Sequence, residues 1–323
     1  MARSDLLVSL IRTGTSGDQV GFRRAAEALI AEEQAKQHGV LATQLADALR
    51  ATAPGAPRQG PTASGGGSPL VFELEPSRRL SELVLPPAVR GAVEGLIEEH
   101  HRSDLLRSYG LEPRHRVLLV GPPGSGKTSL AEVVATEIMV PLLVARYEAL
   151  ITSYLGETAG RLDALFAAVR TRPCVLFFDE FDTIAKERGD THETGEIKRV
   201  VSSLLLQIDR LPSHVVVIVA TNHPELLDRA VWRRFQARLH LPAASREGIV
   251  SFLDGWVARS GISLGYSHRT LADKMLGQSF AEVEEFVATV QRRLVLAGPD
   301  ADRRAVVRRC LEQWKDQILH PNG

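Results

Sequence analysis

The feature that most constrains this chain is a glycine-rich stretch, GPPGSGKT, at residues 121–128. It fits the pattern G-x-x-x-x-G-K-[ST], in which the backbone turns tightly and directs its N–H groups at a phosphate. An apolar run at 116–120 precedes it, as in a buried strand, and apolar residues at helical spacing follow over 129–139. Because a strand, this loop and a helix N-terminus together make an anion site, we predict that the stretch binds nucleotide phosphates.

The residue types within this loop suggest separate roles. Lys127 is expected to reach the β- and γ-phosphates, and the Thr128 hydroxyl is expected to ligate Mg²⁺. The alternative, an ordinary glycine turn, does not account for the flanking strand and helix. The expected phosphate-binding set is Gly121, Pro122, Pro123, Gly124, Ser125, Gly126, Lys127, Thr128 and Ser129.

Apolar runs elsewhere in the chain alternate with helical patterns. This alternation predicts an α/β fold with an open, five-stranded, mostly parallel sheet and helices on both faces. The expected strands are 116–120, 140–146, 173–178, 215–220 and 237–241. Residues 70–74 are a candidate strand outside this count. Ligands of such sheets bind beyond the carboxyl ends of the strands, where the glycine-rich loop also falls.

We expect four segments along the chain. Residues 71–242 form the large α/β subdomain, and residues 243–323, where only helical patterns remain, form a small all-α subdomain. Residues 51–70, rich in Gly, Pro, Ala and Ser, are expected to be a flexible linker. Residues 1–50 carry three short amphipathic patterns, which predict a small helical bundle for docking a partner. The alternative is a helical decoration packed on the main domain.

Net charge, the length of the apolar runs and the cysteines indicate which partners and which compartment to expect. The chain has 39 basic and 39 acidic residues, so its net charge does not point to nucleic acid or an anionic membrane. No apolar run reaches the ~18 residues of a membrane span, and the first residues lack the pattern of a signal peptide. The two cysteines, Cys174 and Cys310, lie far apart without metal-type spacing. We therefore expect a cytoplasmic protein without membrane or nucleic-acid partners.

Two acids follow an apolar run directly, in VLFFDE at 175–180. Asp179 is expected to hold Mg²⁺ through its coordination shell, and Glu180 to orient and polarise the water that attacks the γ-phosphate. The alternative is that Asp179 or Asp182 caps the following helix.

Polar residues later in the chain are candidates for the same site. Asn222 follows the next strand and can hydrogen-bond the attacking water or the γ-phosphate, although alone it would be interpreted as a turn residue before Pro224. Arg233 and Arg234 lie in a basic stretch, WRRFQAR. Spacing alone favours a solvated basic face, but in a ring of subunits these arginines could reach a neighbour's γ-phosphate as arginine fingers.

Taken together, GPPGSGKT, VLFFDEFD at 175–182, VIVATN at 217–222 and PELLDRAVWRRFQARLHLP at 224–242 resemble AAA ATPases, most of all the katanin–spastin type. The resemblance covers residues 75–320. It implies ATP hydrolysis by a ring, usually a hexamer, with ATP sites between subunits. It also implies the phosphate, Mg²⁺, hydrolysis, sensor and finger roles for Gly121 to Thr128, Asp179, Glu180, Asn222, and Arg233 with Arg234.

The same resemblance implies that polypeptide is threaded through a central pore. Tyr154, Leu155 and Gly156 match the family's aromatic–apolar–Gly pore loop, and a second pore loop is expected near 188–196. One departure concerns the helical subdomain, where Phe280 replaces a Gly that lies near the adenine in the family. The implied function is an ATP-driven protein unfoldase or remodeller. The alternative is a nucleotide-gated scaffold that activates a partner enzyme, and a nucleic-acid motor is disfavoured by the balanced charge.

Residues 4–42 resemble the N-terminal part of a bacterial group of short AAA ATPases. Members of that group are often encoded beside a subtilisin-like serine protease and are associated with phage defence. The resemblance implies such a protease as a partner of residues 1–50.

Overall fold

The computed structural model describes residues 70–146, 155–182, 194–298 and 301–319, together with Ala28. Apart from Ala28 and Leu70, the expected bundle and linker lie outside the described residues. The elements described below belong to one compact unit, Gly65–Gly323.

Six strands form one sheet in the order β1-β3-β4-β5-β2-β6. Strands β2 to β6 pair in parallel, and β1 pairs antiparallel with β3 at one edge. The strands are β1 Val71–Leu74, β2 Arg116–Val120, β3 Leu142–Ala145, β4 Cys174–Phe178, β5 Val215–Thr221 and β6 Ala237–His240. The α/β prediction is confirmed, but the expected count of five strands is too low by one. The sixth strand is the candidate at 70–74. Phe72 and Leu74 in it are exposed, so it differs from the fully buried strands that the apolar runs predict.

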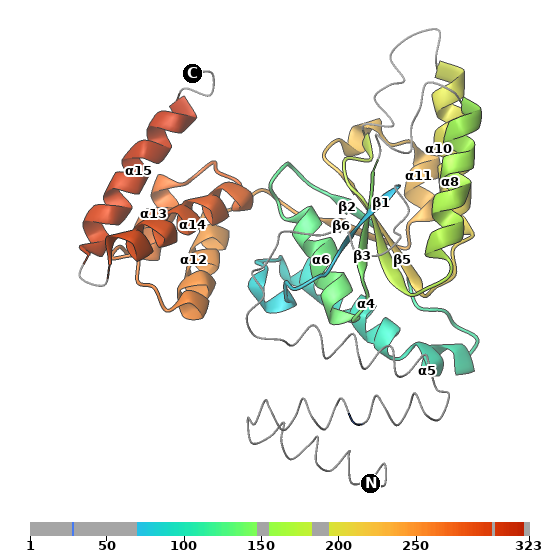
Figure 1. Ribbon diagram of the computed structural model, residues 1–323, viewed down its shortest axis with the longest axis horizontal. Helices are drawn as coiled ribbons and strands as arrows, with labels where there is room; N and C mark the ends of the chain where they lie inside the picture. The colour runs from blue at the N-terminus through green and yellow to red at the C-terminus, as the bar shows by residue number, and fades with distance from the viewer. Residues whose placement is uncertain (1–27, 29–69, 147–154, 183–193, 299–300, 320–323) are drawn as a thin grey trace. The chain divides into compact units, whose positions relative to one another are not determined.

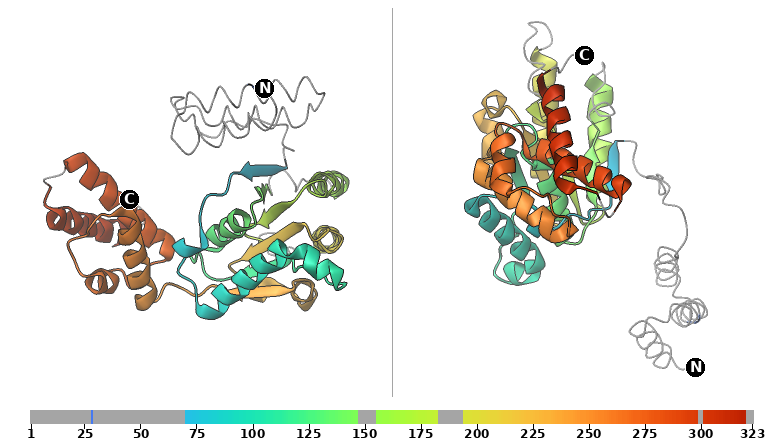
Figure 2. Two further views of the ribbon diagram at one scale, coloured as in Figure 1. Left: turned by 90° about the horizontal axis from the view of Figure 1, so that it is seen from below. Right: turned by 90° about the vertical axis from the view of Figure 1, so that its left-hand side faces the viewer.

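Helices cover both faces of this sheet. In β5, Val217 and Val219 join one hydrophobic core, and Val216 and Ile218 join the other. Side chains alternate between the faces of a strand, so a strand covered on both sides is apolar throughout. Figure 1 shows α4 and α6 on one side of the strands and α8 and α10 on the other, and Figure 2 shows these layers from two further directions. The bounds of these helices are α4 Pro87–His101, α6 Lys127–Glu137, α8 Leu155–Val169 and α10 Thr194–Asp209.

The C-terminal helices pack around a hydrophobic core of their own, which includes Leu253, Phe286 and Val290. They are α12 Arg246–Ser260, α13 His268–Lys274, α14 Phe280–Ala297 and α15 Arg303–Leu319. A serine caps each of the first three, at Ser245, Ser267 and Ser279, by accepting a backbone N–H of the first turn. The shorter elements are η1 Leu80–Glu82, α5 Ser103–Ser108, η3 Pro224–Leu226 and α11 Arg229–Arg234.

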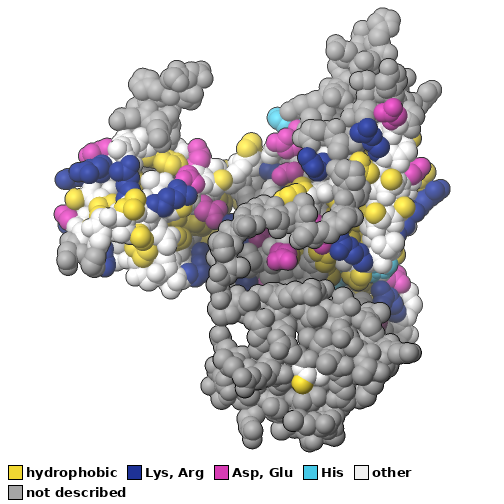
Figure 3. Space-filling model, viewed as in Figure 1, with side chains coloured by type: hydrophobic (Ala, Val, Ile, Leu, Met, Phe, Trp, Pro, Cys, Tyr) yellow, Lys and Arg dark blue, Asp and Glu magenta, His cyan; other side chains and the backbone are white. Residues whose placement is uncertain are grey.

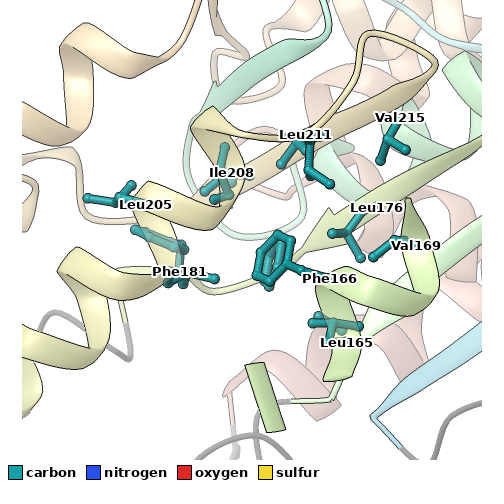
Figure 4. Packing of buried hydrophobic residues seen from close by; sticks show 14 of the residues in the cluster. Leu165, Phe166, Val169, Leu176, Phe181, Leu205, Ile208, Leu211 and Val215 are labelled. Carbon is teal, nitrogen blue, oxygen red and sulfur yellow. The ribbon is translucent and has the colours of Figure 1, made fainter. Parts of the chain in front are cut away.

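Phe166 of α8 is fully buried in the core between the sheet and α10. Its ring stacks on that of Phe178 with centroids 6.5 Å apart. Figure 4 shows it near Leu176 of β4, Ile208 of α10 and Leu211, which follows α10. The packing around this ring ties α8 and α10 to the strand that carries Asp179 at its end.

We expect Phe166→Ala to lower the free energy of unfolding by about 3–5 kcal/mol, because it leaves a cavity in a close-packed core. Chemical denaturation followed by circular dichroism measures the change. Leu105→Ala, at an α5 side chain that is 53% exposed, is the matched control and should shift the free energy by less than ~0.5 kcal/mol. Equal midpoints for the two variants would contradict this assignment of the core.

Candidate nucleotide site

A cavity of about 320 Å³ opens at the carboxyl ends of β2, β4 and β5. Its walls come from three parts of the chain: the glycine-rich loop with the strand ends, the segment 78–85, and α12 with α14. The lining residues are Arg78, Glu82, Leu83, Val84, Leu85, Pro123, Gly124, Ser125, Gly126, Lys127, Thr128, Ser129, Asp179, Glu180, Asn222, Phe252, Phe280, Ala281 and Glu284. The cavity therefore gathers the strand-end residues that were predicted to act together.

The three glycines of the loop are needed for different physical reasons. Gly124 and Gly126 have φ of 69° and 92°, in the left-handed region that glycine adopts at little cost. A Cβ on Gly121 would lie 2.2 Å from the carbonyl oxygen of Leu241, so this glycine allows a close approach of two backbones. A Cβ on Gly124 would also lie 2.5 Å from Ser279 Oγ, at the start of α14. The loop is thus shaped by its own turn and by contacts with distant segments.

Lys127, the first residue of α6, is buried with its ammonium inside the loop. Its Nζ donates to the carbonyl oxygens of Gly121 and Pro122 at 2.8 and 2.9 Å, and to Asn222 Oδ1 at 2.6 Å. Burial lowers the pKa of Lys127, and the charges of the nearby carboxylates, Asp179 first among them, oppose this shift. The ammonium is held where a phosphate at the loop would meet it.

Thr128 and Asp179, the two predicted Mg²⁺ ligands, meet at the cavity. The Thr128 hydroxyl donates to Asp179 Oδ2 at 2.8 Å, which joins the first turn of α6 to the end of β4. A hydroxyl and a carboxylate are hard oxygen donors, and Mg²⁺ in nucleotide sites uses one or two protein ligands and completes its shell with water and phosphate. No cluster of three or more His, Cys, Asp or Glu with metal-site geometry occurs in the described ranges. This donor pair therefore fits Mg²⁺ held partly by a nucleotide.

An anion also fits the loop. The Ser125 Oγ is buried and makes no hydrogen bond within the described part of the chain. A buried hydroxyl without a partner is costly, and a phosphate oxygen in the loop would satisfy it.

Glu180 has a backbone φ of 48°, which is uncommon for a residue other than glycine. Such a conformation costs roughly 1–3 kcal/mol and persists only where neighbours enforce it. Here the Glu180 N–H donates to Asp179 Oδ1 at 3.0 Å, and the Phe181 N–H donates to the Ala220 carbonyl at 2.9 Å. The turn leaves the Glu180 side chain exposed at the cavity, where water has access.

Asp182 is a site residue that sequence reasoning considered only as a helix cap. It is 3% exposed, and its Oδ1 accepts from Thr221 Oγ1 at 3.0 Å and from the Asn222 N–H at 3.3 Å. Asp182 therefore fixes the end of β5 and with it the amide that contacts Lys127. The only hint of this role in the sequence is that Asp182 is a third acid shortly after the pair 179–180. The two groups that it accepts from lie 39 and 40 residues later in the chain.

The two predicted finger residues lie in different surroundings. Arg234, at the end of α11, forms an ion pair with Asp209, which also accepts from Arg116 Nη1 at 3.0 Å. Arg233 is exposed. Neither arginine is among the described residues that line the cavity, so the chain does not bring them to its own site.

Two aromatic rings form part of the cavity wall in the helical subdomain. Phe280, where the resemblance leads one to expect Gly, lies with its ring centroid 6.3 Å from that of Phe252. The Ser279–Glu282 stretch around it forms a reciprocal capping box at the start of α14. The predicted pore residue Tyr154 lies outside the described residues, as does 188–193 of the second pore loop, and Leu155 and Gly156 are described only as the start of α8.

Comparison with known proteins agrees with this geometry. The model of the family described as "ATPase family associated with various cellular activities (AAA)" matches residues 117–243. The "Uncharacterized AAA family ATPase y4kL" of Sinorhizobium fredii is 36% identical over 306 residues, which cover 92% of this chain and 90% of that protein. The chain belongs to the AAA family of ATPases. The predicted ATPase activity is thereby confirmed.

Other relatives are longer proteins matched over shorter regions. The peroxisomal ATPase pex6 of Schizosaccharomyces pombe is 43% identical over 144 residues, 42% of this chain and 15% of that protein. The cell division cycle protein 48 homolog of Archaeoglobus fulgidus is 31% identical over 229 residues, 65% of this chain and 31% of that protein. The katanin–spastin type and the link to phage defence stay predictions.

Basic and acidic side chains lie interspersed on the face shown in Figure 3. Among the described helices, none is both long enough and apolar enough to cross a membrane.

We expect Asp182→Ala to lower kcat about tenfold, because the Asn222 N–H loses the acceptor that fixes its position and the buried Thr221 hydroxyl loses its acceptor as well. Asp182→Asn keeps an oxygen acceptor and should retain most of the activity. Steady-state ATPase assays on both variants measure the effect, with thermal melting to confirm folding. Equal kcat in the alanine and asparagine variants would show that the acceptor does not matter.

Proposed function

We propose that this AAA ATPase is a ring-forming motor that uses Mg²⁺-dependent ATP hydrolysis to remodel or unfold polypeptides. The observation that carries the proposal is the separation of two sets of residues. The cavity collects Lys127, Thr128, Asp179, Glu180 and Asn222, while Arg233 is exposed and lies outside the cavity lining, which supports a role for it at a site on another copy. A hexamer with ATP sites between subunits is the arrangement that the family resemblance implies.

Each site residue has a distinct part in the hydrolysis that we propose. Residues 124–129 hold the phosphates by their backbone N–H groups, which Pro122 and Pro123 lack, with Lys127 charged against the β- and γ-phosphates. Thr128 and Asp179 would hold Mg²⁺, which neutralises charge on these phosphates when bound. Glu180 orients and polarises the attacking water, and Asn222 hydrogen-bonds that water or the γ-phosphate.

We expect Glu180→Gln to lower kcat by about 10²-fold or more while ATP still binds, because the amide cannot accept a proton from water. Phosphate release and binding of a fluorescent ATP analogue are measured on the same preparation. Glu247→Gln, at an exposed glutamate of α12 outside the cavity lining, is the matched control and should keep full activity. Loss of binding in Glu180→Gln, or unchanged turnover, would remove this residue from the hydrolytic role.

Of the two arginines predicted as fingers, we propose that Arg233 acts on the nucleotide of a neighbouring subunit. Adjacent residues of a helix point in directions about 100° apart, so the pair in α11 need not share a task. Arg234 is held by Asp209 and fixes α11 against α10, whereas Arg233 extends from the surface. In a ring it would approach the γ-phosphate bound by the next subunit, where such a guanidinium stabilises the charge of the transition state.

We expect Arg233→Ala to lower kcat by about 10²-fold or more and Arg234→Ala mainly to lower the free energy of unfolding, by about 1 kcal/mol. A mixing assay tests whether Arg233 acts between subunits. Neither Arg233→Ala nor Glu180→Gln should be active alone, but mixed subunits should regain ATPase activity at interfaces that carry both native residues. A mixture as inactive as its components would contradict a finger acting in trans.

Polypeptide as the substrate rests on Tyr154, Leu155 and Gly156 in the pore-loop position. An aromatic and an aliphatic side chain can intercalate between substrate side chains without sequence specificity. We further propose residues 1–50 as the docking segment for a partner, with a subtilisin-like serine protease in bacterial phage defence as the candidate that the N-terminal resemblance supports.

We expect Tyr154→Ala to keep basal ATPase activity and to abolish unfolding of a tagged fluorescent protein in the presence of ATP. Deletion of residues 1–50 is the companion variant, and it should lose partner activation while the ring keeps its ATPase. If Tyr154→Ala keeps full activity toward substrate and only the deletion fails, the protein acts as a nucleotide-gated scaffold for a partner enzyme.

A further inference from the structure

Arg78 connects two walls of the nucleotide cavity. Its guanidinium forms a two-point ion pair with Glu284 of α14, with Nη2···Oε1 at 3.0 Å and Nη1···Oε2 at 3.4 Å. On the other side, its Nε lies 3.7 Å from Oε2 of Glu132 in α6, the helix that begins at the glycine-rich loop. The side chains of Arg78 and Glu132 are 29% and 27% exposed, so this contact is partly shielded from water.

The backbone of Arg78 belongs to the α/β part of the molecule. The N–H groups of Ser77 and Arg78 donate to Glu132 Oε1 at 3.1 and 3.2 Å. The Leu80 N–H donates to Oε1 of Glu137, also in α6, at 3.1 Å. The segment is therefore fastened to α6 at two points, and the Arg78 side chain reaches from it to the helical subdomain.

Helix α14 has a second contact with this part of the molecule, at the loop itself. The Ala281 N–H donates to the Gly124 carbonyl at 3.2 Å, and Ser279 lies against Gly124. Both contacts come from the first turns of α14, whose residues Phe280, Ala281 and Glu284 line the cavity. The Arg78–Glu284 pair thus joins two walls of the same cavity.

We propose that Arg78 is a positioning residue for ATP turnover: by pairing with Glu284 it holds α14 against the glycine-rich loop and slows nucleotide release. The pair is charged and made at two points, with the Arg78 side chain 29% and the Glu284 side chain 47% exposed, so its loss favours the open arrangement of the two walls. Nucleotide dissociation then becomes faster, while the hydrolytic groups at 179–180 keep their positions. This role rests on the cavity being the nucleotide site.

Stopped-flow dissociation of a fluorescent ADP analogue from the full chain tests the proposal. Arg78→Gln and Glu284→Gln should each raise the dissociation rate about fivefold, and the double variant should be no faster than either single variant. The single-turnover rate of hydrolysis should not change. Arg79→Gln is the matched control, since it removes the same charge from an exposed neighbour, and it should release ADP at the native rate.

Several outcomes would overturn this role. Effects of the single variants that multiply in the double variant would mean that the two residues act separately. An effect of Arg78→Gln without one of Glu284→Gln would mean that Arg78 binds nucleotide directly. Lys127→Ala, which should abolish analogue binding, separates these results from a failure of the nucleotide site itself, and melting curves identify any variant that does not fold.

Discussion

The buried ammonium of Lys127 is the interaction on which the site depends. A charge removed from water must be met by oxygen atoms, and here they come from Gly121, Pro122 and Asn222. Two of these lie in the loop itself, and the third lies at the end of a strand 95 residues later. The surroundings of this ammonium are therefore complete when β2 and β5 are paired, which ties the candidate phosphate site to the sheet.

Asp182 extends this dependence by one step. It holds the backbone of Asn222 and the hydroxyl of Thr221, while the backbone just before it bonds Ala220. The ends of β4 and β5 are thus joined by side chains as well as by the strand ladder. The buried carboxylate of Asp182 fixes the backbone of Asn222, and the Asn222 side chain in turn contacts Lys127. A substitution at any of these three residues is therefore expected to shift the other two.

The sequence was sufficient to predict the parts of the site whose chemistry is local. The loop, the acids at 179–180 and Asn222 each sit next to a strong strand pattern, and parallel strands bring their carboxyl ends together. Edge strand β1 was harder to predict from the sequence, because most of its side chains are exposed and it lacks the continuous apolar run of a buried strand. The contacts of Asp182, Arg78 and Arg234 could not be predicted, because their partners lie far along the chain, such as Glu284, 206 residues after Arg78. Pattern and spacing carry no information on such contacts.

The close approach of Gly121 to Leu241 has a mechanical consequence. The Leu241 N–H also donates to the Val120 carbonyl at 2.8 Å, so the last residues of the α/β subdomain lie against the first residue of the loop. The connection to α12 is short, since the N-cap of that helix, Ser245, lies four residues beyond Leu241. A rotation of the helical subdomain about this connection would therefore have its axis beside the glycine-rich loop, so the geometry of the loop and the orientation of that subdomain are coupled through the chain itself.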